Sequence, residues 1–169
     1  MTNSTPTPLY RILFVCLGNI CRSPAGEGIM QQLIDRSPQW AGKIELDSAG
    51  TYGGNAGMKA DRRMRQAASA RGYDLLSISR RIQPSDFEEF DLILAMDDNN
   101  LHDLQRLAAT QEEHDKVHRM TEYCSIPHVD YVPDPYYGGA KGFDHVLDIL
   151  ENSCQNLLDR LPKLIQQRT

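Results

Sequence analysis

The sequence has few cysteines, no long apolar run and no excess of basic residues. Its four cysteines among 169 residues are scattered, and none belongs to a Cys-x-x-Cys metal pair, so we expect neither a disulfide framework nor a structural zinc. No stretch has the length and apolarity of a membrane span. The net charge of −5 gives no general attraction to nucleic acid or to acidic membranes. We therefore expect no metal or other cofactor, no nucleic-acid partner and no membrane partner.

The start of the chain also lacks the basic and apolar blocks of a signal peptide. Residues 1–8 are rich in Thr, Ser, Asn and Pro, and we expect them to form a disordered tail. Residues 9–169 have the length of one ordinary domain and contain no repeat or linker. The sequence therefore predicts a cytoplasmic protein with a single folded domain at 9–169.

Short apolar runs alternate with helical patterns along the chain. This alternation is typical of strand-helix-strand units that form a parallel sheet. The runs at 10–15, 44–48 and 92–95 predict three strands, and a fourth is expected between Lys116 and Thr121. In an open sheet of this kind, ligands bind at the carboxyl ends of the strands where the chain order reverses. The segment after the first strand is such a place.

Helical spacing of apolar residues predicts four helices around these strands, while the polar residues 111–115 predict a loop. The first expected helix turns Ile29, Met30, Leu33 and Ile34 inward and ends at Ser37-Pro38, and the second runs from near Ala60 to a capping Gly72. The third is capped by Asp97 or Asp98 and turns Leu101, Leu104, Leu107 and Ala108 inward. The fourth has an apolar stripe from Val146 to Leu161.

Residues 15–24, Val-Cys-Leu-Gly-Asn-Ile-Cys-Arg-Ser-Pro, stand where the first strand turns into a helix. Unpaired amides at the start of a helix and the helix dipole together form an anion site. Arg22 adds a two-pronged donor for phosphate oxygens. The positive potential there favours the thiolate of Cys16, which can attack a phosphorus atom held above it. The motif therefore predicts a phosphate-binding loop that carries its own nucleophile.

The neighbouring residues support this interpretation. Gly18 and Asn19 tolerate the left-handed backbone that a tight anion-binding loop needs, and Ser23 can donate a hydrogen bond to the thiolate. Pro24 suits the first turn of a helix. The alternative is that Cys16 ends a buried strand while Arg22 forms a surface ion pair, which explains neither the glycine nor the Arg-Ser-Pro ending.

Two further residues have alternative interpretations. Cys21 lies in the same loop as Cys16, so it is either a partner for a disulfide on oxidation or a small buried hydrophobic residue. Asp134 stands between Pro133 and Pro135, which stiffen its backbone. An aryl or alkyl oxygen leaves poorly as an anion, so the reaction needs a general acid, and Asp134 is the candidate. Its alternative role is to start a turn.

The loop resembles the signature of the low-molecular-weight protein tyrosine phosphatases, which stands unchanged at residues 15–24. Further segments are similar to landmarks of that family in the same order, and the resemblance covers about Leu9 to Leu161. These segments are 47–51, 79–91, 96–101 and 134–143. The resemblance implies an α/β fold with a single-domain three-layer sandwich: a four-stranded parallel sheet with helices on both faces and a phosphate-binding loop after the first strand.

The resemblance also implies an activity and roles for particular residues. It implies a protein-tyrosine phosphatase that hydrolyses phosphotyrosine and small aryl phosphate monoesters through a cysteinyl phosphate, with Cys16, Arg22 and Asp134 catalytic and Asp134 acting as general acid and then base. Asn19, Ser23 and Ser48 would support the loop, with Ser48 holding the Asn19 side chain, and Cys21 would be the redox partner of Cys16. The expected phosphate and substrate contacts come from Leu17, Gly18, Asn19, Ile20, Cys21, Arg22, Ser23, Tyr136 and Tyr137.

The sequence departs from the family at one wall of the cleft. The position that often carries an aromatic residue falls at Gly54, next to Asn55. Either Tyr52 stands in for the missing aromatic ring, or the cleft is wider. Tyr136 and Tyr137 are expected at the opposite rim, where an aromatic face can pack against a phosphotyrosine ring. Their alternatives are phosphorylation as a control point, or packing of their own loop alone.

Two other functions fit parts of the pattern. Arsenate reductases of the same fold bind an oxyanion with the same loop, but they relay electrons through cysteines at mid-chain, and this chain has none between Cys21 and Cys124. A pseudo-enzyme that only binds phosphotyrosine would lack a nucleophile or an acid, and here both are present. The expected partners are phosphotyrosine-containing proteins, with autophosphorylated tyrosine kinases among the candidates, and the expected assembly is a monomer or a weak homodimer.

Overall fold

The computed structural model describes residues 8–168. Apart from Pro8, the predicted disordered tail lies outside the described residues. Four parallel strands form one sheet in the order β2-β1-β3-β4. They are β1 (Tyr10–Cys16), β2 (Ile44–Gly50), β3 (Leu92–Ala95) and β4 (Val117–Arg119). The predicted fold class, an α/β domain built on a four-stranded parallel sheet, is confirmed.

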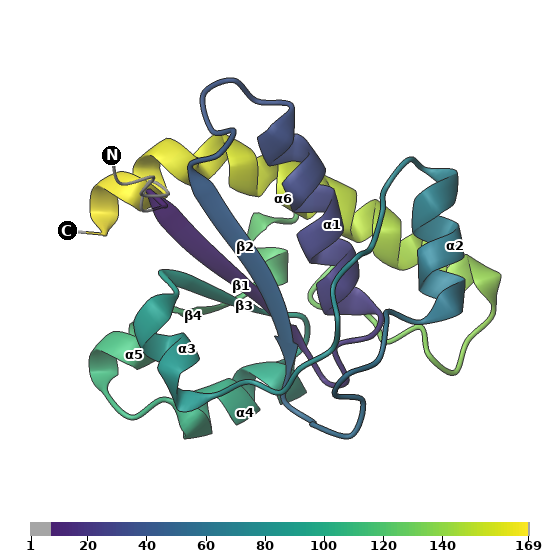
Figure 1. Cartoon of the computed structure of the whole chain (residues 1–169), viewed down its shortest axis with the longest axis horizontal. Helices are drawn as coiled ribbons and strands as arrows, with labels where there is room; N and C mark the ends of the chain where they lie inside the picture. The colour runs from purple at the N-terminus through teal and green to yellow at the C-terminus, as the bar shows by residue number, and fades with distance from the viewer. Residues whose placement is uncertain (1–7, 169) are drawn as a thin grey trace, which may run out of the picture.

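Helices cover both faces of this sheet (Figure 1). On one face lie α1 (Arg22–Asp35), α2 (Arg62–Ala70) and α6 (Ala140–Gln167), and on the other lie α3 (Pro84–Glu89), α4 (Asp98–Leu107) and α5 (Gln111–Asp115). A short 3-10 helix, η1 (Met120–Tyr123), follows β4. None of the helices in the described part of the chain is long and apolar enough to cross a membrane.

The central strand β1 explains why the sheet is covered on both sides. Side chains of a strand alternate between its two faces, and every residue from Ile12 to Val15 is fully buried. Ile12 and Phe14 pack with α1 and α6, whereas Leu13 and Val15 pack with α3 and α4. A continuous apolar run is therefore what a strand buried on both faces requires.

Three details of the helices differ from the prediction. The polar segment Gln111–Asp115, predicted as a loop, is the short helix α5, because Thr110 and Glu113 form a capping box at its start. Leu107, predicted to point inward, is 51 % exposed because it is the last residue of α4. The short helix α3, which has Pro84 in its first turn, was not predicted.

The order of the strands determines where a ligand can bind. From β1 the chain moves first to β2 on one side of it and later to β3 on the other. The carboxyl end of β1 is thus the point where the chain order reverses, and the loop Leu17–Cys21 leaves the sheet there and leads into α1.

Candidate active site

The loop between β1 and α1 turns its carbonyl groups outward. Five consecutive carbonyls accept hydrogen bonds from outside the loop: Cys16 from the Thr51 amide (3.0 Å), Leu17 from the Tyr52 amide (2.9 Å), Gly18 from the Asn55 side chain (3.3 Å), Asn19 from the Ser79 hydroxyl (2.5 Å) and Ile20 from the Asp61 amide (2.7 Å). The amides on the other side of this backbone therefore face the centre of the loop, at the N-terminal end of α1. Such a ring of N–H groups stabilises an anion.

Asn19 gives the loop its sharp curvature. Its φ of 56° lies in the left-handed region, as predicted for this residue. Its side chain is buried, donates to the Ser23 hydroxyl at 2.8 Å and accepts from the Arg80 amide at 3.0 Å. Gly18 lies outside the left-handed region, and its lack of a side chain has another reason. A Cβ atom there would come within 2.6 Å of the Asn55 side chain, which bonds the Gly18 carbonyl.

The expected hydrogen bond between Ser48 and Asn19 is not formed. The Ser48 hydroxyl is buried and has no hydrogen-bond partner among residues 8–168. Ser48 pairs with Phe14 in the sheet, two residues before Cys16, so it lies below the level of the loop. Asn19 is held instead by two other groups: the Ser79 hydroxyl donates to its carbonyl, and the Arg80 amide donates to its side chain.

Cys16 lies within hydrogen-bonding distance of a hydroxyl in the first turn of α1. Its Sγ lies 3.0 Å from Ser23 Oγ, and Asn19 donates to the same oxygen atom. Because that oxygen already accepts a hydrogen bond from Asn19, the hydroxyl hydrogen of Ser23 is free to point at the sulfur. A hydroxyl that donates to sulfur stabilises the thiolate form.

Arg22 is fixed by three groups from other elements. Its side chain is 3 % exposed, and Nη1 donates to Asp97 Oδ2 at 2.6 Å and to the Val132 carbonyl at 3.0 Å. Nη2 lies 3.7 Å from Asp134 Oδ2. Asp97, one of the two predicted caps of α4, accepts from the Asn100 amide at 2.8 Å, but its contact with Arg22 was not predicted. The guanidinium is thus held in one orientation beside the loop.

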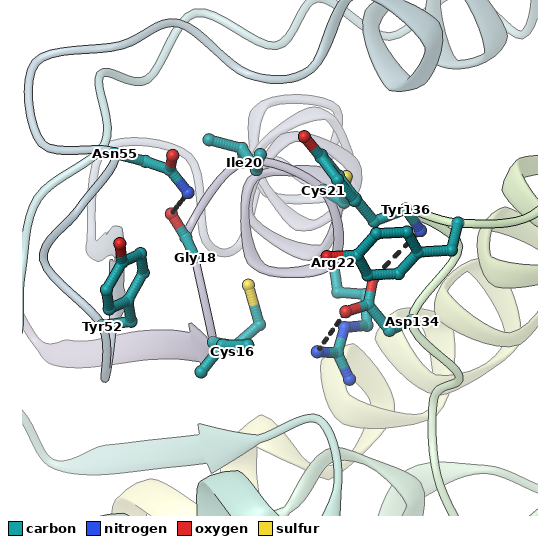
Figure 2. Close-up of a pocket in the computed structure, with 11 residues that line it drawn as sticks. Cys16, Gly18, Ile20, Cys21, Arg22, Tyr52, Asn55, Asp134 and Tyr136 are labelled. Atoms are coloured by element: carbon teal, nitrogen blue, oxygen red, sulfur yellow. Dashed lines mark hydrogen bonds and ion pairs between the residues drawn. The ribbon is translucent and has the colours of Figure 1, made fainter.

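Asp134 faces Cys16 across a cleft, as Figure 2 shows. Its Oδ1 accepts a hydrogen bond from the Tyr136 amide at 3.0 Å, so the carboxyl is oriented by its own segment. The cleft brings together all three predicted catalytic residues and most of the predicted contact residues. It is lined by Cys16, Leu17, Gly18, Ile20, Cys21, Arg22, Tyr52, Asn55, Asp134, Tyr136 and Tyr137.

Tyr52 lines this cleft on the side away from Asp134 and Tyr136 (Figure 2). A Cβ atom on Gly54 would lie only 2.1 Å from the Tyr52 ring, so the ring occupies space that any other residue at position 54 would take. The absence of a side chain at Gly54 and the placement of Tyr52 are therefore two parts of one arrangement. This geometry favours the first of the two alternatives, in which Tyr52 stands in as the aromatic wall.

Cys21 is a free, buried thiol in the same loop. Burial raises its pKa well above the usual range, and the negative charge of Asp61 adds to this effect. Its sulfur is therefore protonated at neutral pH.

The fold and the cleft place the chain among the α/β enzymes that bind a phosphate group at the carboxyl end of a parallel sheet. A family model described as "Low molecular weight phosphotyrosine protein phosphatase" matches residues 11–167. The chain therefore belongs to this family, and it is a phosphatase.

Similar proteins agree with this assignment. A protein of Synechocystis sp., provisionally named a low molecular weight protein-tyrosine-phosphatase, is 48% identical over 90% of this chain and 97% of its own length. A crystal structure of a protein tyrosine phosphatase from Entamoeba histolytica superposes with a TM-score of 0.87 at 44% identity, over 91% of this chain and 97% of that one. A Drosophila arginine phosphatase superposes with a TM-score of 0.81 at 32% identity, over 88% of this chain and 96% of that one.

Proposed function

We propose that this phosphatase hydrolyses phosphotyrosine and small aryl phosphate monoesters through a cysteinyl phosphate. The observation that carries the proposal is the convergence of Cys16, Arg22 and Asp134 on one cleft, beside five consecutive carbonyls, those of residues 16–20, that accept hydrogen bonds from outside the loop. These three residues come from the end of β1, the start of α1 and the segment before α6. Together they supply a nucleophile, an electrostatic clamp and a proton donor.

In the first step, the Cys16 thiolate attacks the phosphorus atom while the bond between phosphorus and the aryl oxygen breaks. Asp134 gives its proton to the departing oxygen, which would otherwise leave as a poor anion. The loop amides and Arg22 stabilise the charge on the three phosphoryl oxygens during transfer. The alcohol leaves, and the phosphoryl group is bound to sulfur.

In the second step, a water molecule takes the place of the leaving group. The Asp134 carboxylate now accepts a proton from this water, whose oxygen attacks the phosphorus atom. The bond between phosphorus and sulfur breaks, phosphate leaves, and the Cys16 thiolate is restored. The hydrogen bond from Ser23 makes Cys16 a better leaving group at this point, since it stabilises the thiolate that forms.

The walls of the cleft favour an aromatic phosphate ester. Tyr52 lies on one side, and Tyr136 and Tyr137 lie on the other with their rings 4.9 Å apart at near right angles. Aromatic faces on both sides of the loop can pack against a phenyl ring that enters between them. We therefore propose phosphotyrosine-containing proteins as substrates, with autophosphorylated tyrosine kinases as candidates.

Asp134→Asn should separate substrates by their leaving groups. We expect turnover of a phosphotyrosyl peptide to fall by roughly 10²-fold or more, because the tyrosyl oxygen needs the proton, whereas 4-nitrophenyl phosphate should be affected much less. The measurement is kcat/KM of the wild type and of Asp134→Asn on these two substrates. Equal losses on both would assign Asp134 a structural role, and faster cleavage of a phosphoarginyl than of a phosphotyrosyl peptide by the wild type would contradict the proposed substrate.

Oxidation should test the role of Cys21. Peroxide should convert the Cys16 thiolate to a sulfenic acid, which then condenses with the Cys21 thiol to give a disulfide and water. Closing this bridge distorts the loop, so the oxidised enzyme should be inactive, and a dithiol should restore it. In Cys21→Ser we expect far less recoverable activity after the same dose, because nothing protects the sulfenic acid from further oxidation. Equal recovery in both proteins would make Cys21 a packing residue only.

A further inference from the structure

The segment that carries Asp134 is attached to the rest of the protein by few polar contacts. Its start is fixed, because Val132 is fully buried and its amide donates to the Met96 carbonyl at 2.8 Å. From residue 133 to 139, however, the hydrogen bonds found in the described chain stay within the segment or reach only the first turn of α6. Its other polar tie is the pair between Asp134 and Arg22, at 3.7 Å.

Arg63, near the start of α2, supplies an additional contact. Its guanidinium lies over the Tyr136 ring, 5.2 Å from the ring centre, and over the Phe143 ring of α6 at 4.9 Å. A cation within about 6 Å of an aromatic face is attracted to it by the charge distribution of the ring. Arg63 therefore joins the Asp134 segment to α2 and to the first part of α6, which lies beside α2 in Figure 1.

Asp61 fixes the guanidinium in this position. Its two carboxylate oxygens accept from Nε and Nη2 of Arg63 at 3.1 and 3.0 Å, and it also caps α2 by accepting from the Arg63 amide. These hydrogen bonds lower the pKa of Asp61, so the carboxylate stays ionised. The backbone amide of Asp61 in turn donates to the Ile20 carbonyl of the phosphate-binding loop at 2.7 Å.

A continuous set of contacts thus runs from the phosphate-binding loop to the candidate acid. It passes through Asp61 and Arg63 to the ring of Tyr136, whose amide donates to Asp134 Oδ1. We propose that Arg63 is a positioning residue that holds the Asp134 segment over the phosphate-binding loop by stacking on Tyr136. This inference rests on the proposed function of Asp134 as the general acid.

The test uses Arg63→Ala, with Arg62→Ala as the matched control. Arg62 is the preceding residue of the same helix, carries the same charge and lines a different surface groove with Tyr73 and Leu76. We expect kcat/KM of Arg63→Ala to fall on the order of tenfold on phenyl phosphate and on a phosphotyrosyl peptide, because a small displacement of a catalytic group is costly. On 4-nitrophenyl phosphate kcat/KM should fall little, because that leaving group depends much less on the proton of Asp134. Arg62→Ala should match the wild type on all three.

Arg63→Lys distinguishes the contact of the cation with the aromatic rings from the paired hydrogen bonds to Asp61. An ammonium group can still lie over the rings but cannot bond Asp61 with two parallel hydrogen bonds, so we expect a partial recovery of the lost activity. Inhibition by inorganic phosphate should be unchanged in every Arg63 variant, because the loop itself is intact. Thermal unfolding of each variant verifies that it is folded at the assay temperature.

The outcomes separate the two proposals. If Arg63→Ala behaves like Arg62→Ala while Asp134→Asn still affects poor leaving groups most, the positioning role is wrong and the proposed function stands. If Arg63→Ala loses activity equally on all substrates and binds phosphate poorly, Arg63 is merely structural and the positioning role is again wrong. If Asp134→Asn itself shows no dependence on the leaving group, the proposed acid fails, whatever the Arg63 variants do.

Discussion

Cys16→Ser should abolish turnover and leave phosphate binding largely intact. A hydroxyl is a far weaker nucleophile than a thiolate, so we expect kcat to fall by a factor of about 10⁴ or more. The loop amides and Arg22 do not depend on the sulfur, and the five outward carbonyls keep the amides facing the anion. Inhibition constants for inorganic phosphate, or calorimetric titration of the variant with phosphate, measure the second part of the prediction.

The control for this experiment is Cys124→Ser. Cys124 is a free cysteine that follows η1 and takes no part in the cleft, so its replacement should leave turnover and phosphate binding unchanged. Turnover by Cys16→Ser near the wild-type rate would rule out Cys16 as the nucleophile. Loss of phosphate binding together with turnover would mean that the sulfur also maintains the shape of the loop.

Local patterns were sufficient to predict the sheet and the loop. Apolar patterns indicate which side chains are buried, so they located the strands and the long helices. These patterns are the apolar run before Cys16, the alternating runs further along and the stripe on α6. The left-handed backbone of Asn19 was also predictable locally, because the preference for that conformation belongs to the residue type itself. Short helices were harder to predict, because α5 depends on a capping box rather than on an apolar stripe.

The groups that brace the site were not predictable from local patterns. Asn55 and Ser79 bond carbonyls of the loop from 37 and 60 residues away, and neither stands in a motif that indicates this. The expected bond from Ser48 failed because its register in β2 places it below the loop, and register depends on the assembled sheet. At the cleft wall the sequence left two alternatives open, and Tyr52, which lines the cleft on the side away from Asp134 (Figure 2), favours its role as the aromatic wall over a wider cleft.

Arg22→Lys should be nearly as damaging as the loss of the nucleophile. The guanidinium is held by Asp97 and the Val132 carbonyl through Nη1, which leaves the other side of its planar fork directed toward Asp134 and the cleft. A lysine is a point charge on a flexible stem, so it cannot satisfy Asp97 and follow two phosphoryl oxygens at once. We expect a loss of about 10³-fold in kcat/KM, the range in which a transition-state arginine contributes to phosphoryl transfer.

The measurement is kcat/KM together with the inhibition constant for phosphate, because both depend on the fork. Arg106→Lys provides the matched control, since Arg106 is an exposed residue of α4 whose partner is the neighbouring Asp103. That exchange should change neither quantity. Thermal unfolding of Arg22→Lys shows whether the half-satisfied Asp97 destabilises the fold, and activity is compared at a temperature where both proteins are folded. If kcat/KM of folded Arg22→Lys lies within about threefold of the wild-type value, Arg22 is not the phosphate clamp, because a clamp predicts a far larger loss.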